Sequence, residues 1–521
     1  NKNLPARYAN VFGSFYQAIF TAKDAIRDIQ FIESLLSTGR EQVDLRSDNN
    51  KGESVVYFYS KRFYHLTEIM PDLQNLALIV IDENTYQLKV EAEKFYIYTY
   101  YVKSLNELET SFVSFKSKFC ELLLAVLENR TENDVLNGLL LSAGLNQQEI
   151  NLFILYRNYY WQIGAPYLPV NNSFIKNPEV ILALKDYFIA KFKPSDGLIP
   201  LTPEQLKPLE DRALKAIEQV QTVAEDIIFK TIFNLIQASI RTNFFDMDEF
   251  SDMAVKIKSA NVERMPSPRP LYEIYVHGTH IEGIHLRGAM IARGGLRHSD
   301  RPSDFRSEVL GLMHTQMLKN VVIVPEGSKG GFITKRHTAD RAGQVEEVKI
   351  QYKRYINSLL SLTDNIVDGQ VVPARSIVRY DGDDPYLVVA ADKGTAALSD
   401  TANEISYKRG FWLKDAFASG GKHGYDHKGM AITARGAWES VKLHFLQENK
   451  DIQTTRFSVI GIGDMSGDVF GNGMLLSRFI CLKGAFNHIH IFVDPDPDPE
   501  TSFQERERLF NTPGSTWMDY D

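Results

Sequence analysis

A lysine set among glycines is the residue whose type and surroundings best suit it to chemistry: Lys329, in the stretch VPEGSKGGF at residues 324–332. A lysine in such a place can hold a phosphate, act on a carbonyl group, or lie on an exposed turn. The P-loop that cradles phosphates needs an earlier glycine at a fixed spacing and a Ser or Thr directly after the lysine, and both are missing here. Phosphate binding is therefore disfavoured, and the choice between the other two roles depends on the charged residues nearby.

Three cationic residues flank the same predicted strand–helix–strand stretch. Arg293 and Arg297 lie in IARGGLRHSDRPSDF, and Lys319 ends the helix predicted for DFRSEVLGLMHTQMLKN. Together they favour an anionic substrate that carries carboxylates, although each alone is more simply a solvated surface charge. Cations close together would also lower the pKa of a buried lysine and supply neutral amine for proton transfer. We therefore expect the glycines to turn the backbone tightly, so that Lys329 faces a substrate cleft.

An acidic residue, Asp392, directly follows the apolar run YLVVAA, which predicts a buried strand. Active sites of α/β proteins gather at the carboxyl ends of such strands, so Asp392 is a candidate partner of the lysine. The alternative is a helix N-cap, because the segment KGTAALSD that follows predicts the start of a helix.

A glycine-containing turn between a strand and a helix indicates nucleotide binding. In FSVIGIGDMSG the glycines are Gly461, Gly463 and Gly467, where backbone N–H groups can approach a pyrophosphate. The usual pattern is G-x-G-x-x-G, but Ser466 takes the third glycine position and Gly467 follows one residue late. A plain structural turn is an equally good interpretation of these residues alone.

The run HIHIFVD predicts the next strand and ends in Asp494. A carboxylate there can accept hydrogen bonds from a ribose diol and would repel a ribose 2′-phosphate, which favours NAD over NADP. The alternative is that Asp494 only begins the acidic loop DPDPDPE. Because a complete nucleotide-binding sheet needs further strands, we expect the sequence to be truncated within this domain.

The composition is that of a globular protein, with 44% hydrophobic and 24% charged residues and a net charge of −8. The charge argues against a surface that coats nucleic acid, and no apolar stretch is long enough to span a membrane. The two cysteines, Cys120 and Cys481, suit a reducing compartment, so a cytoplasmic protein is expected. No His/Cys cluster has the spacing of metal ligands, so no metal is expected.

The order of predicted elements indicates a multidomain protein of α+β and α/β class. Its expected parts are an N-terminal segment (1–53), an ACT-like α+β module (54–103), a helical domain (104–264), a substrate-binding α/β domain (265–400) and a truncated Rossmann-like NAD-binding domain (401–521). MPSPRP, at residues 265–270, is expected to be a linker, because prolines interrupt both helices and strands.

Apolar residues in the expected helical domain recur at spacings of three and four. Phe119, Leu122 and Val126 form one such stripe, and Ile217 and Phe233 belong to another. Stripes of this kind predict helices with one buried face, and core packing explains them better than contact with a cofactor.

Five stretches follow one another in a distinctive order. They are ARGGLRHSDRPSDFRSEVLGLM, MLKNVVIVPEGSKGGF, VVAADKGTAALSD, FWLKDAFASGGKHGYDHKGMAITARGAWESVKLHF and GIGDMSGDVFGNGML. As an ordered set they resemble the glutamate dehydrogenases, specifically the large NAD-specific bacterial type, over most of residues 271–494. The preceding helical and ACT-like parts resemble, less distinctively, the region before the catalytic part of these enzymes.

The resemblance implies a role for each candidate residue. Lys329 matches the catalytic lysine of the family, Lys319 the lysine that holds the substrate α-carboxylate, and Asp392 the acidic partner in proton transfer. Arg293 stands where the small enzymes have a lysine that holds the side-chain carboxylate. The positive charge is kept, but a planar guanidinium and an ammonium bind with different geometry.

The resemblance also implies the reaction: NAD-dependent oxidative deamination of L-glutamate to 2-oxoglutarate and ammonia. Thr433 and Arg435, in TARG, match the stretch near the nicotinamide. It further implies a homo-oligomer, with an amino-acid effector at the ACT-like module and no nucleic-acid or membrane partner. A dehydrogenase of another amino acid and a catalytically inactive amino-acid-sensing protein remain alternatives. The charge of Arg293 argues against an apolar substrate, and the joint presence of the catalytic candidates argues against an inactive protein.

Overall fold

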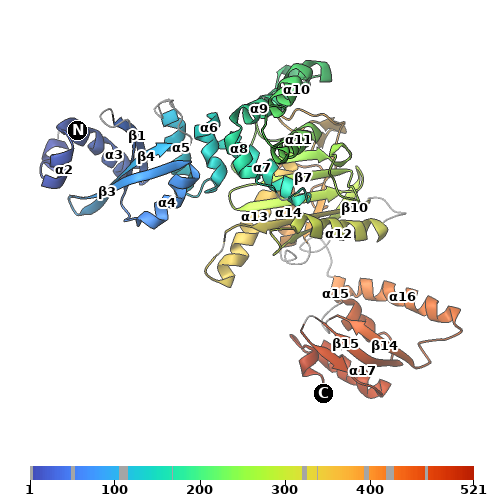
Figure 1. Cartoon of the computed structure of the whole chain (residues 1–521). Coiled ribbons are helices and arrows are strands. Elements are labelled where there is room, and N and C mark those ends of the chain that lie inside the picture. Colours follow the sequence, from blue (N-terminus) through green and yellow to red (C-terminus); the bar gives the residue numbers. More distant parts are fainter. Residues whose placement is uncertain are drawn as a thin grey trace. The chain divides into compact units, whose positions relative to one another are not determined.

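The chain forms two compact units, one up to Lys414 and the other from Asp415 onward, and each is described by itself (Figure 1). The structure is a computed structural model, and it describes residues 4–48, 53–104, 115–166, 168–319, 326–336, 338–391, 398–417, 427–463, 468–487 and 489–521. Within these ranges, no helix is both long enough and apolar enough to cross a membrane.

The first unit begins with a four-stranded antiparallel sheet in the order β1-β2-β4-β3. Its strands are β1 (Gln42–Asp48), β2 (Glu53–Ser60), β3 (Leu78–Val90) and β4 (Glu93–Ser104), and its helices are α1 (Leu4–Tyr8), α2 (Ser14–Ile19), α3 (Ala22–Thr38) and α4 (Leu66–Asn75). Successive residues of β2 alternate between two cores: Tyr57 and Tyr59 pack on the side of α3, and Val56 and Phe58 pack on the other side. Since β1 belongs to this sheet, the module starts earlier than residue 54.

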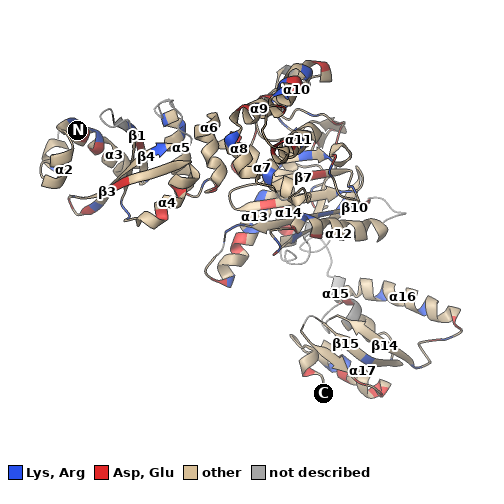
Figure 2. Ribbon diagram, viewed as in Figure 1, with Lys and Arg blue, Asp and Glu red and all other residues tan. Residues whose placement is uncertain are grey.

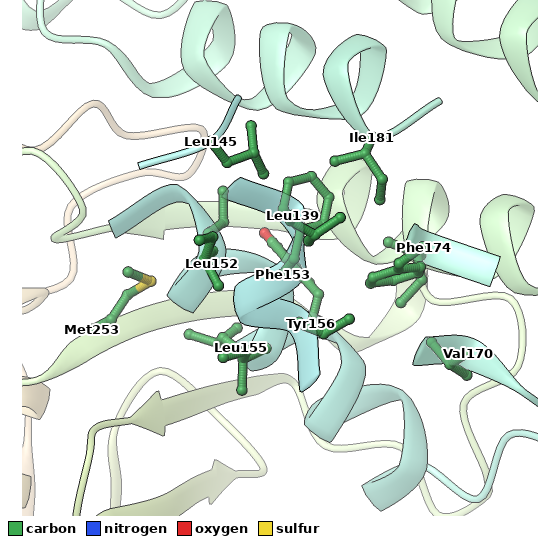
Figure 3. Packing of buried hydrophobic residues seen from close by; sticks show 14 of the residues in the cluster. Leu139, Leu145, Leu152, Phe153, Leu155, Tyr156, Val170, Phe174, Ile181 and Met253 are labelled. Carbon is green, nitrogen blue, oxygen red and sulfur yellow. The ribbon is translucent and has the colours of Figure 1, made fainter. Parts of the chain in front are cut away.

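Helices follow, as the apolar stripes predicted. They are α5 (Lys116–Leu127), α6 (Leu139–Ala143), α7 (Gln147–Gln162), α8 (Val170–Lys176), α9 (Pro178–Phe192), α10 (Pro203–Ile217) and α11 (Val223–Ala238). Figure 3 shows Phe153 and Tyr156 of α7 packed among Leu139, Phe174 and Ile181 from α6, α8 and α9. A helix that is apolar around most of its circumference is buried on all sides. The helix α7 is therefore the centre of this layer.

The second predicted stripe is divided between two helices. Ile217 is the last residue of α10 and Phe233 lies on α11, and both are buried. A capping box starts α11, in which the Thr222 hydroxyl accepts from the Glu225 N–H and the Glu225 carboxylate accepts from the Thr222 N–H. The burial was predicted correctly, and the break between the helices was not.

Lys329 and Arg293 lie on a seven-stranded mixed sheet in the order β13-β9-β10-β8-β7-β6-β5. Its strands are β5 (Ser239–Thr242), β6 (Met253–Lys258), β7 (Tyr272–His277), β8 (Ile281–Arg287), β9 (Ala292–His298), β10 (Glu326–Thr334) and β13 (Val388–Ala391). The strands β13, β9 and β10 are parallel to one another and the remaining pairs are antiparallel. The expected α/β class is thus observed as a mixed sheet.

Helices cover both faces of this sheet. They are α12 (Phe305–Lys319), α13 (Arg341–Ser361) and α14 (Ser399–Lys408), and a small hairpin, β11 (Asn365–Val367) with β12 (Gln370–Val372), lies between α13 and β13 in the chain. A Cβ added at Gly331 would meet Val309 of α12, whereas one added at Gly283 would meet Tyr355 of α13. The helices α12 and α13 therefore lie on opposite faces.

The proline-containing segment MPSPRP connects two neighbouring strands of one sheet. The strands β6 and β7, on either side of it, pair antiparallel along their whole length, and Met265 is buried. The prediction that this segment is a linker between domains is therefore wrong. Prolines interrupt regular structure equally well in a loop between paired strands, so composition alone did not distinguish the two cases.

The second unit contains a three-stranded sheet in the order β14-β15-β16. Its elements are α15 (His427–Met430), α16 (Ile432–Gln447), β14 (Phe457–Ile462), β15 (Ile480–Phe486), β16 (Ile491–Val493) and α17 (Pro499–Phe510). Trp438 and Phe445 of α16 and Leu509 of α17 pack with Phe457 and Leu482 of the sheet. The strands β14 and β15 are parallel, but β16 runs antiparallel to β15.

Charged residues of both signs are interspersed along the surface helices. Basic and acidic residues occur together on α10, α13 and α17 (Figure 2). Pairs such as Lys207–Asp211, with Nζ 3.0 Å from Oδ1, lie one helical turn apart. These helices thus present mixed-sign, hydrated faces.

Candidate active site

Lys329 lies in the middle of strand β10, between β8 and β9, and its relative exposure is 8%. Its partner on β8 is Leu286, which is fully buried. The prediction of a tight, glycine-rich turn at this lysine is therefore wrong, because residues 326–334 form a regular strand. An exposed surface turn is excluded for the same reason.

The glycines beside Lys329 allow helices to pack closely against both faces of the strand. A Cβ at Gly327 would lie 2.8 Å from the backbone N of Met317, and one at Gly331 would lie 2.5 Å from Val309, both on α12. On the opposite face, a Cβ at Gly330 would lie 2.2 Å from Leu296 of β9 and 3.1 Å from the Tyr355 hydroxyl of α13. At Gly327 the clash is with backbone atoms, so this position requires glycine, whereas at Gly330 and Gly331 neighbouring side chains would have to move.

Arg293 and Lys329 lie on the same face of the sheet. Arg297 of β9 faces α12, because its Nη1 lies 3.2 Å from Oε1 of Glu308. Arg293 is four residues earlier on the same strand and therefore shares that face, as does Lys329, which lies between Gly327 and Gly331. Both cations thus face α12.

The two arginines of β9 differ in availability. Arg297 is paired with Glu308 and is half-buried, whereas Arg293 is exposed at the start of the strand and is the register partner of Gly327. Gln316 of α12 donates from Nε2 to the backbone oxygen of Arg293 at 3.3 Å. Of the two, Arg293 is the residue whose charge remains available to a ligand.

Lys319 ends α12, at the same end of the sheet as Arg293. The helix begins at a buried ion pair, in which Arg306 Nη2 lies 2.6 Å from Oε1 of Glu273. Its last turn crosses the start of β10, since Met317 lies over Gly327. The side chain of Lys319 and all of Asp392 lie outside the described residues. The backbone therefore brings Lys319 toward Arg293.

The strand predicted from YLVVAA is observed at its end, as Val388–Ala391. It is β13, which pairs parallel with β9 so that Val388 lies opposite Arg293 and Ala391 opposite Leu296. Lys329 precedes Gly330, which is also the partner of Leu296, on the other side of β9. The strand that carries Lys329 and the strand that precedes Asp392 in the sequence therefore flank β9.

A buried histidine lies on the face opposite Lys329. His285 of β8 is the register partner of Gly330. Burial, together with the charge of Arg287, lowers the pKa of His285 to about 3. The imidazole is therefore neutral at pH 7 and adds no positive charge on the sheet face opposite Lys329.

The predicted nucleotide turn follows the expected strand, β14. Gly461 is buried in this strand, and Gly463 has φ +147°, a conformation that residues with a Cβ rarely adopt. The N–H of Gly463 donates to the Phe486 carbonyl at 2.9 Å, and its carbonyl accepts from Trp517 Nε1 at 2.9 Å. Gly467 lies outside the described residues, which resume in a π-helical turn at Asp468–Asn472.

Asp494 does not lie where a ribose-binding carboxylate was expected. The parallel neighbour of β14 is β15, which the sequence analysis did not separate from the preceding segment. Asp494 follows the antiparallel β16, and its N–H donates to the carbonyl of Lys483 within β15. It is therefore displaced from the carboxyl end of β15 at Phe486, and the prediction that HIHIFVD forms the next strand after the glycine turn is wrong, because β15 comes between them.

Thr433 and Arg435 lie in the first turn of α16, and both are exposed. Ala434 between them is buried, and Ala431 before the helix has φ +53°. The helix thus turns its small residue inward and leaves both polar side chains accessible.

A cluster of buried charges was missed altogether. Arg241, Lys256 and Arg287 pair with aspartates of the segment that precedes β13. No sequence signal pointed to them, because the partners lie about a hundred or more positions apart and charged residues are usually exposed.

Comparison with known proteins agrees with the sequence resemblance. Residues 212–521 match the family model of the bacterial NAD-glutamate dehydrogenase catalytic domain, and residues 131–194 match that of glutamate dehydrogenase helical motif 3. The NAD-specific glutamate dehydrogenase of Halomonas elongata is 42% identical over 99% of this chain, and that of Pseudomonas aeruginosa is 40% identical over 100% of it. The chain spans 33% of the length of each.

A solved hetero-hexameric glutamate dehydrogenase from Thermus thermophilus, in its leucine-bound form, is 17% identical to this chain. The match covers 46% of this chain and 52% of that one, with a TM-score of 0.30. A score this low supports no argument about the arrangement of the fold.

Proposed function

Because the chain belongs to the family of bacterial NAD-glutamate dehydrogenases, we propose that it carries the catalytic region for the oxidative deamination of L-glutamate to 2-oxoglutarate and ammonia. The observation that carries the proposal is the placement of Lys329. It is a buried lysine on a central strand, and it shares one sheet face with the exposed cation Arg293.

Arg293 and Lys319 hold the two carboxylates of glutamate in this proposal. Arg293 binds the side-chain carboxylate, for which a guanidinium supplies two parallel donors. Lys319, at the end of α12, binds the α-carboxylate. Holding the substrate at both ends orients its α-carbon and removes much of the entropic barrier to reaction.

Lys329 performs the acid–base chemistry. It activates water for attack on the imine of the oxidised substrate and stabilises the charge that develops there. Asp392, directly after β13, relays protons to and from the substrate nitrogen. The arrangement of β10, β9 and β13 as parallel neighbours supports this pairing of roles, since it brings both chain segments to one part of the sheet.

We further propose that the second unit is a Rossmann-like domain that binds NAD, which, when bound, accepts the hydride from the substrate. Gly461, Gly463 and Gly467 lie near the pyrophosphate in this proposal, and Thr433 and Arg435 lie toward the nicotinamide. The conformation of Gly463 fits a close approach of backbone to ligand. The ribose-binding role of Asp494 has lost its support and is not part of the proposal.

The edge of the small sheet is consistent with this domain type. The strand β14 has no partner on its outer edge among the described residues, and Ile460 and Ile462 are 76% and 75% exposed. A nucleotide-binding sheet needs further strands beside the one that carries the glycines.

The four-stranded N-terminal sheet is proposed as an ACT-like module for an amino-acid effector, and homo-oligomerisation remains a prediction.

Substitution of the lysine tests the proposed activity. In the full-length protein, Lys329→Ala is expected to lower glutamate-dependent formation of NADH at least about a hundredfold, because general acid–base catalysis is lost. The matched control is Lys349→Ala. The side chain of Lys349, on α13, is partly exposed, so this variant should retain the wild-type rate. A Lys329→Ala protein that keeps its rate would refute the role.

Substrate choice is tested at Arg293. Arg293→Leu removes the cation for the side-chain carboxylate, so kcat/KM for glutamate should fall far more than kcat/KM for norvaline, which lacks that carboxylate. An unchanged preference between the two amino acids would favour a dehydrogenase of another amino acid. Wild-type protein that forms no NADH from glutamate would favour a catalytically inactive regulatory protein.

A further inference from the structure

Six buried charged residues form one cluster on the seven-stranded sheet, outside the site described above. The exposed fractions of their side chains range from 0% to 6%. The members of this charge cluster are Arg241 on β5, Lys256 on β6, Arg287 on β8, and Asp364, Asp381 and Asp384. Three buried cations face three buried carboxylates. At the rim, the partly exposed Arg379 also pairs with Asp364 at 3.0 Å and with the exposed Asp383 at 2.8 Å, so the charges still balance.

Asp384 is held by two cations from different strands. Its Oδ2 accepts from Lys256 Nζ at 2.7 Å and from Arg287 Nη2. Burial alone would raise the pKa of Asp384, but Arg287 and Lys256 lower it to about 2, so the carboxylate stays charged. Arg287 also donates from Nη1 to the backbone oxygen of Tyr386 at 3.0 Å. Two groups of the segment 384–386, the Asp384 side chain and the Tyr386 backbone oxygen, are thus bound to residues of the sheet strands.

The other half of the cluster holds the same segment further upstream. Arg241 donates from Nε to Asp381 at 2.6 Å and from Nη1 to Asp364 at 2.9 Å. The second oxygen of Asp364 accepts from the N–H of Asp384 at 2.8 Å, and Lys256 also pairs with Asp381. The two halves are therefore one connected network.

The cluster joins two different parts of the chain. All three cations come from sheet strands, whereas all three carboxylates come from the segment 362–386. That segment continues directly into β13, which is four residues long and, in the described part of the chain, pairs only with β9 at the edge of the sheet. Few hydrogen bonds of its own hold so short an edge strand. A shift of one residue would turn every side chain to the other face.

We propose that Asp384 and Arg287 are positioning residues for the proposed reaction. They fix where β13 lies along β9, and thereby the point on the sheet at which the chain leaves β13 at Ala391, directly before Asp392 in the sequence. This inference rests on the proposed function for the role of Asp392, but the placement of β13 is testable without it.

The test removes one cation and one carboxylate together in the full-length protein. Arg287→Met with Asp384→Asn keeps the remaining cluster neutral, which favours folding. Hydrogen exchange in peptides that span residues 386–391 is expected to rise about tenfold or more, because β13 opens more often. The kcat for glutamate should fall about tenfold with a KM change below about threefold, since the acid is displaced while the carboxylate-binding cations remain.

The matched control removes another buried ion pair of the first unit. Arg157 Nη2 lies 2.7 Å from Oδ2 of Asp134, with exposed side-chain fractions of 6% and 17%, and neither residue lies on a strand of the sheet. Arg157→Met with Asp134→Asn should leave both the exchange at 386–391 and kcat unchanged. If that control reproduces the fall in kcat, the effect is general destabilisation and the inference is overturned.

Other outcomes also decide the inference. Unchanged exchange at 386–391, or increased exchange with kcat within about twofold of wild type, overturns it. If the double variant does not fold, Arg287→Lys replaces it, because this variant keeps the charge but loses the hydrogen bond to Tyr386. The rise in hydrogen exchange at residues 386–391 and the fall in kcat are then both expected to be smaller. If the wild-type protein forms no NADH, the proposed function fails, while the exchange measurement still decides the placement of β13.

Discussion

Replacing Gly327 by alanine should push the end of α12 away from the sheet. The new Cβ would lie 2.8 Å from the backbone N of Met317 and 3.0 Å from the backbone C of Gln316. Ordinary contact begins at about 3.4 Å, so the last turn of the helix must move by about 0.6 Å. Backbone atoms cannot rotate out of the way as a side chain can, so the helix itself must shift.

The shift has a cost in stability and in substrate binding. Overpacking of this kind costs about 1–3 kcal/mol, so the midpoint of thermal unfolding should fall. Lys319 ends the displaced turn, and a misplacement of this size should raise the KM for glutamate about tenfold. Both quantities can be measured on the same preparation, by thermal unfolding and by the formation of NADH.

The matched control is Gly311→Ala in the middle of the same helix. A Cβ at Gly311 meets nothing within 4 Å, and alanine in a helix interior is better than glycine by about 0.5–1 kcal/mol. This variant should therefore be slightly more stable, with an unchanged KM. The reasoning fails if Gly327→Ala unfolds at the wild-type temperature with a wild-type KM, or if Gly311→Ala is equally damaging.

Two further predictions concern charge and packing in the first unit. Burial raises the pKa of Asp72 to about 6, and no described residue forms an ion pair with it. Since the pKa of Asp72 is higher in the folded than in the unfolded chain, ionisation of its carboxyl lowers the stability of the fold progressively from about pH 4 to pH 6, and fully above that range. Asp72→Asn should therefore stabilise the protein by about 1 kcal/mol at pH 7, a figure reduced for the partial exposure of the side chain. Below about pH 4 the substitution should not stabilise it at all. Denaturant unfolding at the two pH values checks this, and equal effects at both would contradict it. Phe153→Ala, in the fully buried centre of α7, should cost about 3–5 kcal/mol in the same assay. Val345→Ala, at a position of the first unit that is 63% exposed on α13, should change little. A small effect at Phe153 would count against a tightly packed α7.

Elements with strong local signals were predicted well from the sequence. The helix that ends at Lys319 is α12, and the run YLVVAA ends in the strand β13 as expected. Apolar periodicity and the residues that flank it act within one element, so they can be recognised without knowledge of the partners. The stripe of Phe119, Leu122 and Val126 is buried on α5 for the same reason.

The errors share a different physical cause. The glycines around Lys329 were interpreted as a turn, because glycine permits turn conformations that other residues avoid. In the structure they are needed because α12 packs on the strand, a contact with residues earlier in the chain. The strands β5 and β6 were likewise assigned to the helical domain, and only their pairing with β7 places them in the sheet.

Residue types and short spacings were enough to indicate which residues could do the chemistry. A lysine among glycines, an arginine and a lysine for two carboxylates, and an acid after a buried strand are properties of residue type and short spacing. The folded structure was needed to show that Lys329 is buried on a strand and shares a face with Arg293, and that Asp494 follows an antiparallel strand. Strand order, strand direction and the close approach of a helix depend on contacts between distant segments, which no local pattern specifies.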